Sequence, residues 1–355
     1  MPGQTRGGGA MPRAKAAEEA LWERSVRFAL TVTPPVLLAA FLGAQSWLIY
    51  ALVTATVAFA ADTGGRPLAR LVPMALGGFV VALGGATATL LGGSTPLLIA
   101  AFAVCGVIYA LTESAAPVAL TLSRFLCFSL AIGALYPPFG VVDLEFIAGT
   151  AAAAWLISVG WDGLRRRWRP STAPSWLRLR AQLRASHRER RIFAVAVAVT
   201  IPLTYWTSVS LGLERPYWAL LTLVLVLRVD FLSSRKLMVE RFLGTVLGVL
   251  MAGFYARFFP NRHALMIGIV LAALARWPAQ RQADVLGVAV LTMYVMLVIE
   301  LIATARGDAG GLLEARVLDT AAGCAFALFA LGLDRGLRWI VAACRPIVPR
   351  SSPEP

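Results

Sequence analysis

Long apolar runs, separated by short polar or basic turns, make up most of the chain. An α-helix needs about 20 residues to cross a hydrocarbon core roughly 30 Å thick, and the pattern predicts twelve such helices, several of them short. They are expected at residues 26–43, 46–61, 71–91, 96–112, 117–136, 144–161, 192–211, 216–232, 242–259, 264–275, 284–304 and 317–335. The run at 264–275 is too short to span unless it extends toward Trp277 and Pro278.

The composition also indicates an integral membrane protein. Of 355 residues, 58% are hydrophobic and 15% are charged, and the mean hydropathy is +0.72. These values lie far outside the range of soluble globular domains. The beginning of the chain lacks the short apolar run and small-residue cleavage site of a signal peptide.

The charge distribution predicts the orientation in the membrane. The formal net charge is +14, and most of the 33 Lys and Arg residues fall on the cytoplasmic side if both termini do. By the positive-inside rule, we expect a multi-pass protein of the bacterial inner membrane with both termini cytoplasmic. The densest basic segment lies within residues 163–191 and is interpreted as a linker resting on anionic membrane lipid. Nucleic acid is not expected as a partner.

The second half of the chain repeats residues of the first at shifts of 168 and 171. The matching pairs are Tyr50 with Trp218, Thr54 with Thr222, Asp62 with Asp230, Arg70 with Arg241 and Gly77 with Gly248. Six helices is an even number, so both repeats begin on the same side of the membrane. We predict an all-α polytopic membrane protein, with two parallel six-helix repeats around a pseudo-twofold axis along the membrane normal. Such an axis encloses a pathway.

The resulting organisation has five parts. They are a polar tail at 1–24, expected to be disordered, a first repeat at 25–162, the Arg-rich linker at 163–191, a second repeat at 192–338 and a tail at 339–355.

Charged residues inside apolar runs are the candidate site. Arg228 lies eleven residues after Tyr217, about 17 Å along a helix, and either it snorkels to the interface or it lines a watery cavity beside Asp230. Arg124 lies about seven residues inside its own helix, without an acidic residue there. Such residues would form a net-positive ring around a cytoplasmic vestibule, which attracts anions. The other members at similar depth are Asp62, Arg70 and Arg241.

On the opposite side, Glu300 ends the eleventh run in apolar surroundings and is the candidate proton carrier. Arg316 and Asp319 are one helical turn apart, so they form either a local pair or a point where a substrate carboxylate is received. Residues 244–248 form a GxxxG element, for which close helix packing is expected. Pro34 and Pro35 are expected to break or kink the first helix.

The sequence gives little support for enzyme activity. The two histidines, His187 and His263, lie in predicted loops, and neither a phosphate-binding loop nor a hydrolase or metalloprotease motif occurs. No cofactor or metal is expected.

Four submotifs in the second half occur in a characteristic order, within RPYWALLTLVLVLRVDFLSSRKLMVERFLGTVLG (215–248) and EARVLDTAAGCAFAL (314–328). The first is W-A-x-x-T, at Trp218, Ala219 and Thr222, and the second is a basic turn at Arg235 and Lys236. The third is R-x-x-G-T-x-x-G, at Arg241, Gly244, Thr245 and Gly248. The fourth is R-x-x-D-T-x-x-G, at Arg316, Asp319, Thr320 and Gly323. This half resembles the fusaric acid resistance (FUSC) or aromatic acid exporter family, in a compact form without the large cytoplasmic domain. The first half resembles it only through the repeat, since Pro73 stands where Gly244 would correspond. The similarity of that family to plant anion channels implies two six-helix units facing each other around a basic pore.

The combined interpretation is an exporter of organic anions, aromatic or amphipathic carboxylates, through a basic pathway between the two repeats. Trp218 would accept the aromatic ring of the substrate, and Thr222 is a further candidate pathway residue. Two alternatives stay open: a passive anion channel, and a non-transporting membrane scaffold whose linker binds lipid or a partner. The expected partners are membrane lipids and a small organic anion, and homo-oligomerisation is left open.

Overall fold

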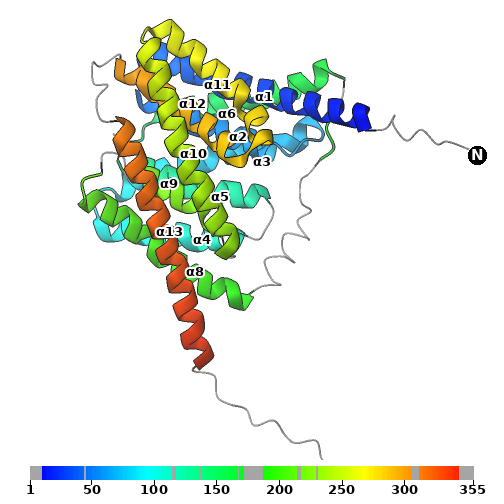
Figure 1. Ribbon diagram of the computed structural model, residues 1–355. Helices are drawn as coiled ribbons and strands as arrows, with labels where there is room; N and C mark the ends of the chain where they lie inside the picture. Colours follow the sequence, from blue (N-terminus) through cyan, green and yellow to red (C-terminus); the bar gives the residue numbers. More distant parts are fainter. Residues whose placement is uncertain are drawn as a thin grey trace, which may run out of the picture.

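The computed structural model consists of α-helices throughout the part of the chain that it describes, and no strand occurs there (Figure 1). It describes residues 10–43, 45–113, 117–135, 138–166, 168–171, 187–213, 217–228, 231–304 and 312–343. The helices are α1 (Ala10–Phe41), α2 (Gln45–Ala61), α3 (Pro67–Leu91), α4 (Thr95–Thr112), α5 (Pro117–Gly133), α6 (Val141–Leu164), α8 (His187–Ser210), α9 (Tyr217–Val226), α10 (Phe231–Phe258), α11 (Arg262–Gln282), α12 (Asp284–Thr304) and α13 (Leu312–Ala343). Each predicted apolar run coincides with one of them, which confirms the all-helical prediction.

Seven of these helices are long and apolar enough to cross a membrane: α3, α4, α6, α8, α10, α12 and α13. Shorter apolar helices lie at Trp47–Ala61, Pro117–Gly133 and Tyr217–Val226. The chain is therefore a multi-pass helical membrane protein. The total of twelve spans stays a prediction, because the 10 residues of α9 extend only about 15 Å.

The first helix is longer than the sequence suggests. It begins at Ala10, so residues 10–24 are its first turns and the prediction of a disordered tail is wrong for them. Pro34 and Pro35 lie inside the helix and do not end it. Proline is tolerated in membrane helices where neighbouring elements compensate for the lost hydrogen bonds, and α1 packs along α2, α6 and α11. The prediction of a break is therefore wrong. Similarly, α11 continues past Trp277 and Pro278 to Gln282.

Each half forms its own helical bundle. In the first half, α3 packs against α5, α2 and α6, and α4 packs against α5. In the second half, α10 packs against α12 and α13, α11 against α12, and α13 against α8 and α9. The fifth helix of each half thus lies between the third and the fourth.

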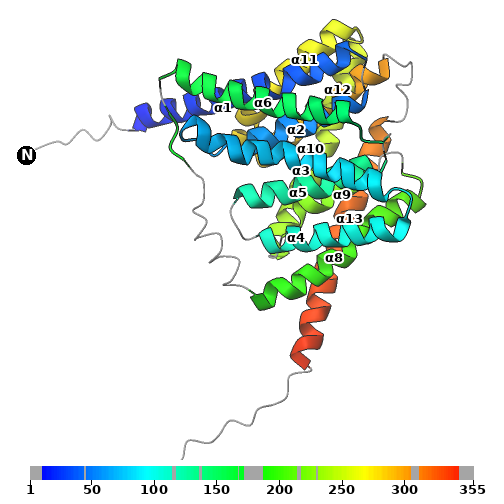
Figure 2. The ribbon, with the colours of Figure 1, turned by 180° about the vertical axis from the view of Figure 1, so that it is seen from behind.

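The two bundles meet mainly through three pairs of helices. Helix α1 of the first half packs on α11 of the second, α4 packs on α8, and α5 packs on α9. In Figure 2 the α1–α11 contact lies at one edge of the assembly and the α4–α8 contact at the opposite edge. A continuous apolar core runs through both bundles, from Phe28 to Leu331.

The predicted GxxxG packing is confirmed in the contact between α10 and α12. A Cβ on Gly244 would lie 2.6 Å from Cβ of Val288, and a Cβ on Gly248 would lie 2.6 Å from Cβ of Thr292. Only glycine allows the two helices to approach this closely.

Candidate functional site

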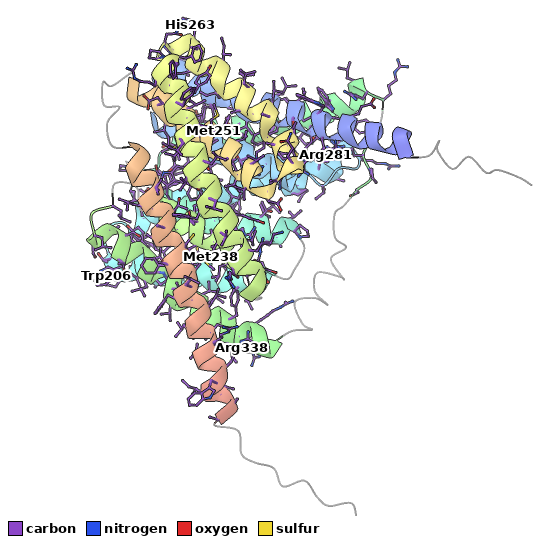
Figure 3. The ribbon with its side chains drawn as sticks, in the orientation of Figure 1. Trp206, Met238, Met251, His263, Arg281 and Arg338 are labelled. Atoms are coloured by element: carbon purple, nitrogen blue, oxygen red, sulfur yellow. The ribbon has the colours of Figure 1, made fainter. Side chains whose placement is uncertain are left out.

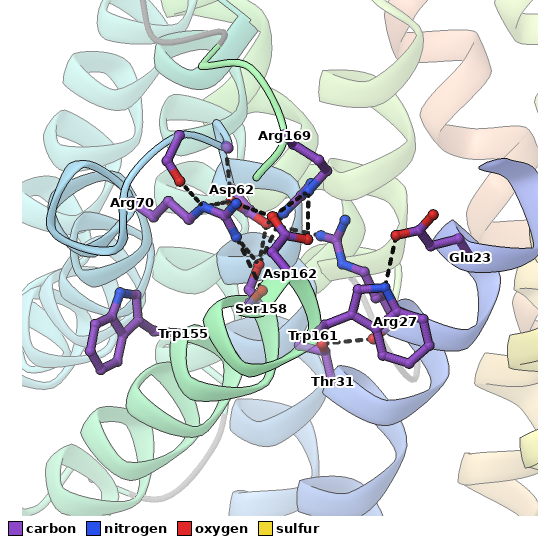
Figure 4. Close-up of polar contacts among 12 residues, drawn as sticks. Glu23, Arg27, Thr31, Asp62, Arg70, Trp155, Ser158, Trp161, Asp162 and Arg169 are labelled. Carbon is purple, nitrogen blue, oxygen red and sulfur yellow. Dashed lines mark hydrogen bonds and ion pairs between the residues drawn. The ribbon is translucent and has the colours of Figure 1, made fainter. Parts of the chain in front are cut away.

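A buried ion-pair network closes one end of the first bundle (Figure 4). Asp62 directly follows α2, and its carboxylate accepts a hydrogen bond of 2.9 Å from Nη2 of Arg27 on α1. It also accepts hydrogen bonds from the hydroxyl of Ser158 on α6 and from Arg169. The side chain of Asp62 is 1% exposed. Three separate segments, α1, α6 and the start of the linker, therefore converge on this single carboxylate.

Arg70 on α3 is the second centre of the network and is fully buried. Its Nη2 contacts the carboxylate of Asp162 on α6, and its Nη1 donates to the backbone carbonyl and the hydroxyl of Ser158, both at 3.1 Å. Its Nε donates to the carbonyl of Gly65 at 3.0 Å and lies 3.7 Å from Asp62. The nitrogens of Arg70 are thus provided with partners inside the first half.

The network holds the Asp62 carboxylate in its charged form. Burial by itself would raise the pKa of Asp62, but hydrogen bonds from Ser158 and Arg169, and the positive charge of Arg169, outweigh burial, so the pKa lies below the usual value of 3.8. Arg169 also donates to Asp162 at 3.1 Å. The start of the linker is thereby fastened to the ends of α2 and α6.

Arg124 and Arg228, two of the charged residues predicted to form the site, are brought together around Tyr109 of α4. The guanidinium carbon of Arg124, on α5, lies 5.9 Å from the centre of the Tyr109 ring. The Tyr109 hydroxyl donates a hydrogen bond of 2.5 Å to the backbone carbonyl of Leu227, the residue that precedes Arg228. Tyr109 is fully buried, and the charge of Arg228 acts on it. A residue of the first half thus connects both arginines across the contact between halves.

Neither guanidinium is neutralised within the described residues. Nε and Nη2 of Arg124 and Nη1 of Arg228 are buried and have no hydrogen-bond partner there. Glu113, after the end of α4, acts electrostatically on Tyr109 but forms no ion pair with either arginine among the described contacts. The backbone of Arg228 is fixed by Ser234, whose hydroxyl accepts from its N–H at 2.8 Å and donates to its carbonyl at 3.1 Å. Asp230 lies outside the described residues.

The other predicted pathway residues occupy packed positions in the second half. Trp218 is 6% exposed, and its ring lies 6.1 Å from that of Phe128 on α5. Thr222 is fully buried and packs on Gly323 of α13, where an added Cβ would lie 2.6 Å from Cβ of Thr222. Asp319 is buried on α13, and Glu300 is partly buried near the end of α12. The side chain of Arg316 lies outside the described residues.

Sequence reasoning missed several residues of these clusters. Arg27, Ser158, Asp162 and Arg169 complete the network around Asp62, and Tyr109 joins the two arginines. Asp162 could have been found as an acidic residue at the end of an apolar helix. Nothing in the sequence marks Tyr109, because its importance depends on which helices become neighbours.

Groups of His, Cys, Asp or Glu that could hold a metal ion do not occur in the described part of the chain. The clusters above consist mainly of guanidinium groups, which are suited to binding carboxylates or phosphates through paired hydrogen bonds.

A comparison with protein families covers the second bundle. Residues 191–330 match the family model described as fusaric acid resistance protein-like. These residues belong to that family. The resemblance of the submotifs is thereby confirmed. The fusaric acid resistance region contains Trp218, Thr222, Arg228, Arg241 and Asp319, whereas the Asp62 network and Arg124 precede it. No curated protein and no solved structure matches the chain.

Proposed function

We propose that this protein exports organic anions, aromatic or amphipathic carboxylates, across the bacterial inner membrane. The family match to residues 191–330 supports a membrane transporter of the resistance type. The observation that carries the choice of an anion is the meeting of Arg124 and Arg228 at Tyr109. A buried, unpaired guanidinium is costly in a membrane interior, and an anion passing between the halves would offset that cost.

The pathway is proposed to lie between two repeats related by a pseudo-twofold axis. The helix contacts support this, because the first helix of each half packs on the fourth helix of the other, as α1 on α11 and α8 on α4. The residue contacts agree. Tyr109 of α4 hydrogen-bonds to Leu227, and the ring of Trp277 on α11 lies tilted against that of Phe59 with 5.5 Å between ring centres. Tyr109 and Trp277 are 168 residues apart, as are Phe59 and Leu227.

Within this proposal, the predicted pathway residues have different roles. Arg124, Arg228 and Arg241 attract the anion, and Trp218 and Thr222 form the wall at the contact between halves. Asp62 and Arg70 hold the adjoining helix ends in place through their ion pairs. Glu300 is proposed as the proton carrier, and Arg316 and Asp319 as the point of release on the outer side.

The test is the accumulation of labelled 4-hydroxybenzoate and fusaric acid in cells with and without the protein. Expression should lower accumulation, and Arg124→Gln or Arg228→Gln should restore it toward the level of cells without the protein. Arg257→Gln is the matched control, because Arg257 is exposed near the end of α10.

Unchanged accumulation across a broad panel of aromatic acids would reject export. Large single-channel anion currents in patch recordings would instead identify a passive anion channel built on the same arginines. A phenotype that survives both arginine substitutions but is lost on truncation of the linker would indicate a scaffold.

A further inference from the structure

Arg241 and Arg70 hold equivalent positions in the two repeats but have opposite surroundings. Arg70 is paired with Asp62 and Asp162. Arg241, on α10, is only 8% exposed, and its Nε has no hydrogen-bond partner within the described residues. The group on α13 whose charge would favour the Arg241 guanidinium is the thiol of Cys324, which is not a carboxylate. Among the described residues, Arg241 therefore has no counter-charge, whereas Arg70 at the corresponding position is neutralised.

A second arginine, Arg276, lies within electrostatic range of Arg241, and a third, Arg24, adjoins Arg276 at the contact between α1 and α11. Arg276, on α11, is within electrostatic range of both Arg241 and Arg24. The guanidinium carbons of Arg24 and Arg276 lie 4.7 Å and 5.5 Å from the centre of the Trp277 ring. Two guanidinium groups, from α1 and α11, thus lie over one tryptophan, and Arg241 of α10 is within electrostatic range of Arg276. Figure 3 shows α10 rising from Met238 toward Met251 and α11 returning from His263 to Arg281.

The backbone of α12 makes room for this cluster. A Cβ on Gly287 would lie 2.7 Å from Nη1 of Arg276, so glycine at this position lets the guanidinium lie against the start of α12. The same nitrogen donates to Oε1 of Gln280 at 3.2 Å. Asp284 is the carboxylate within range of Arg276, but it is half-exposed and lies 3.8 Å from Nζ of Lys236. The cluster retains an excess of positive charge.

The wall beside the arginines is aromatic. The Trp277 ring lies 5.0 Å from the ring of Phe28 and 5.5 Å from that of Phe59, measured between centres. Guanidinium groups beside aromatic surface suit a ligand with an oxyanion at one end and an apolar ring at the other. Like charges held together in a partly buried site repel one another, and a bound oxyanion relieves that repulsion.

We propose that Arg241, Arg276 and Arg24 form an oxyanion-binding site beside Trp277 that takes the carboxylate of the transported aromatic acid. The assignment to the substrate rests on the proposed function. The phosphate of an anionic lipid has the same chemistry, and the experiment below separates the two sources. The Asp62–Arg70 network is the counterpart of this site in the first repeat, closed by two carboxylates of its own.

The test is equilibrium binding of labelled 4-hydroxybenzoate to the purified full-length protein in detergent, which does not depend on transport. Arg241→Gln and Arg276→Gln should each weaken binding about tenfold or more, the loss expected for one charge-assisted hydrogen bond. Arg241→Lys keeps the charge but loses the planar fork, so it should bind with intermediate affinity. Arg257→Gln, on the same helix and exposed, should bind like the unmodified protein.

Thermal unfolding shows whether a variant has simply lost its fold. Because Arg241 has no counter-charge in the described part of the chain, Arg241→Gln should unfold at the same temperature as the unmodified protein or higher, whereas Arg70→Gln should unfold at a lower temperature. Added 4-hydroxybenzoate should raise the unfolding temperature of the unmodified protein and leave that of Arg241→Gln unchanged.

Equal binding by Arg241→Gln and the unmodified protein would overturn the site, even if export were established. Stabilisation by vesicles containing phosphatidylglycerol, without any response to 4-hydroxybenzoate, would overturn its assignment to the substrate. Arginine-dependent binding without export would support the site and reject the transport function instead.

Discussion

Identical residue types at repeat-related positions can have opposite electrostatic roles in this protein. Arg70 follows Asp62 by eight residues, and Arg241 follows Asp230 by eleven. The difference arises from α6, which brings Ser158 and Asp162 to Arg70, whereas α13 brings Cys324 toward Arg241. A guanidinium that is paired in the protein stabilises the fold, and one that is unpaired is available to a ligand.

At the residue scale, Asp62→Asn should lower the free energy of unfolding by about 3–5 kcal/mol, because it leaves buried arginines without their counter-charge. Burial raises the pKa of Asp62, but its hydrogen bonds lower it further, to below 3.8. Its stabilising contribution is therefore full above about pH 4 and is lost as pH falls through the lower pKa of the folded state. Thermal unfolding in detergent between pH 7 and pH 3 measures both effects.

The unmodified protein should lose stability steeply at the acid end, and the loss in Asp62→Asn should be shallower. Glu145→Gln is the control, since Glu145 is exposed on α6, and it should change neither quantity. An acid limb of the same steepness in both proteins would contradict a lowered pKa at Asp62.

At the scale of helices, the apolar runs of the sequence predict where each helix lies, but they predict poorly the residues at which it begins and ends. All twelve runs coincide with helices because each buries its backbone polar groups internally, as a membrane requires. The ends depend on tertiary contacts. α9 ends at Val226 rather than 232, and the backbone of Arg228 is held by Ser234 instead of by a further helical turn. α1 runs through two prolines because neighbouring helices support it.

Helix packing gives a second prediction, in the contact between α10 and α12. Gly248→Ala should cost about 1–3 kcal/mol through overpacking, since the new Cβ would meet the carbonyl of Ala289 and Cβ of Thr292. Gly332→Ala on α13 is the control, because nothing lies within 4 Å of a Cβ there. Unfolding temperatures in detergent measure both. A Gly248→Ala protein as stable as Gly332→Ala would show that the two helices pack less closely than described.

At the scale of the whole molecule, the two halves contact each other at opposite edges, through α1 with α11 and α4 with α8. Arginine clusters lie near each of these contacts, around Tyr109 and around Trp277. The proposed pathway therefore depends on the association of both halves, and neither half contains it alone.

The prediction at this scale concerns the orientation of the protein in the membrane. A green fluorescent protein fused after Pro355 should fluoresce, because the positive-inside rule places the C-terminus in the cytoplasm. Alkaline phosphatase inserted at Asn261, between α10 and α11, should be active, because one helix passage separates it from the cytoplasmic side of α10. The reverse pattern of activities would contradict the predicted orientation.

By itself, the sequence determined the helical membrane class, the positions of the helices and the family of residues 191–330, because hydrophobic length and local motifs are properties of contiguous residues. It also pointed to Arg124 and Arg228 as charges that require an explanation. Only the tertiary structure decided that Arg70 is neutralised, that Arg241 meets no carboxylate among the described residues, and that Tyr109 and Trp277 adjoin arginines. The reason is that the free energy of a buried charge depends on its neighbours in space, and helices far apart in the chain supply those neighbours.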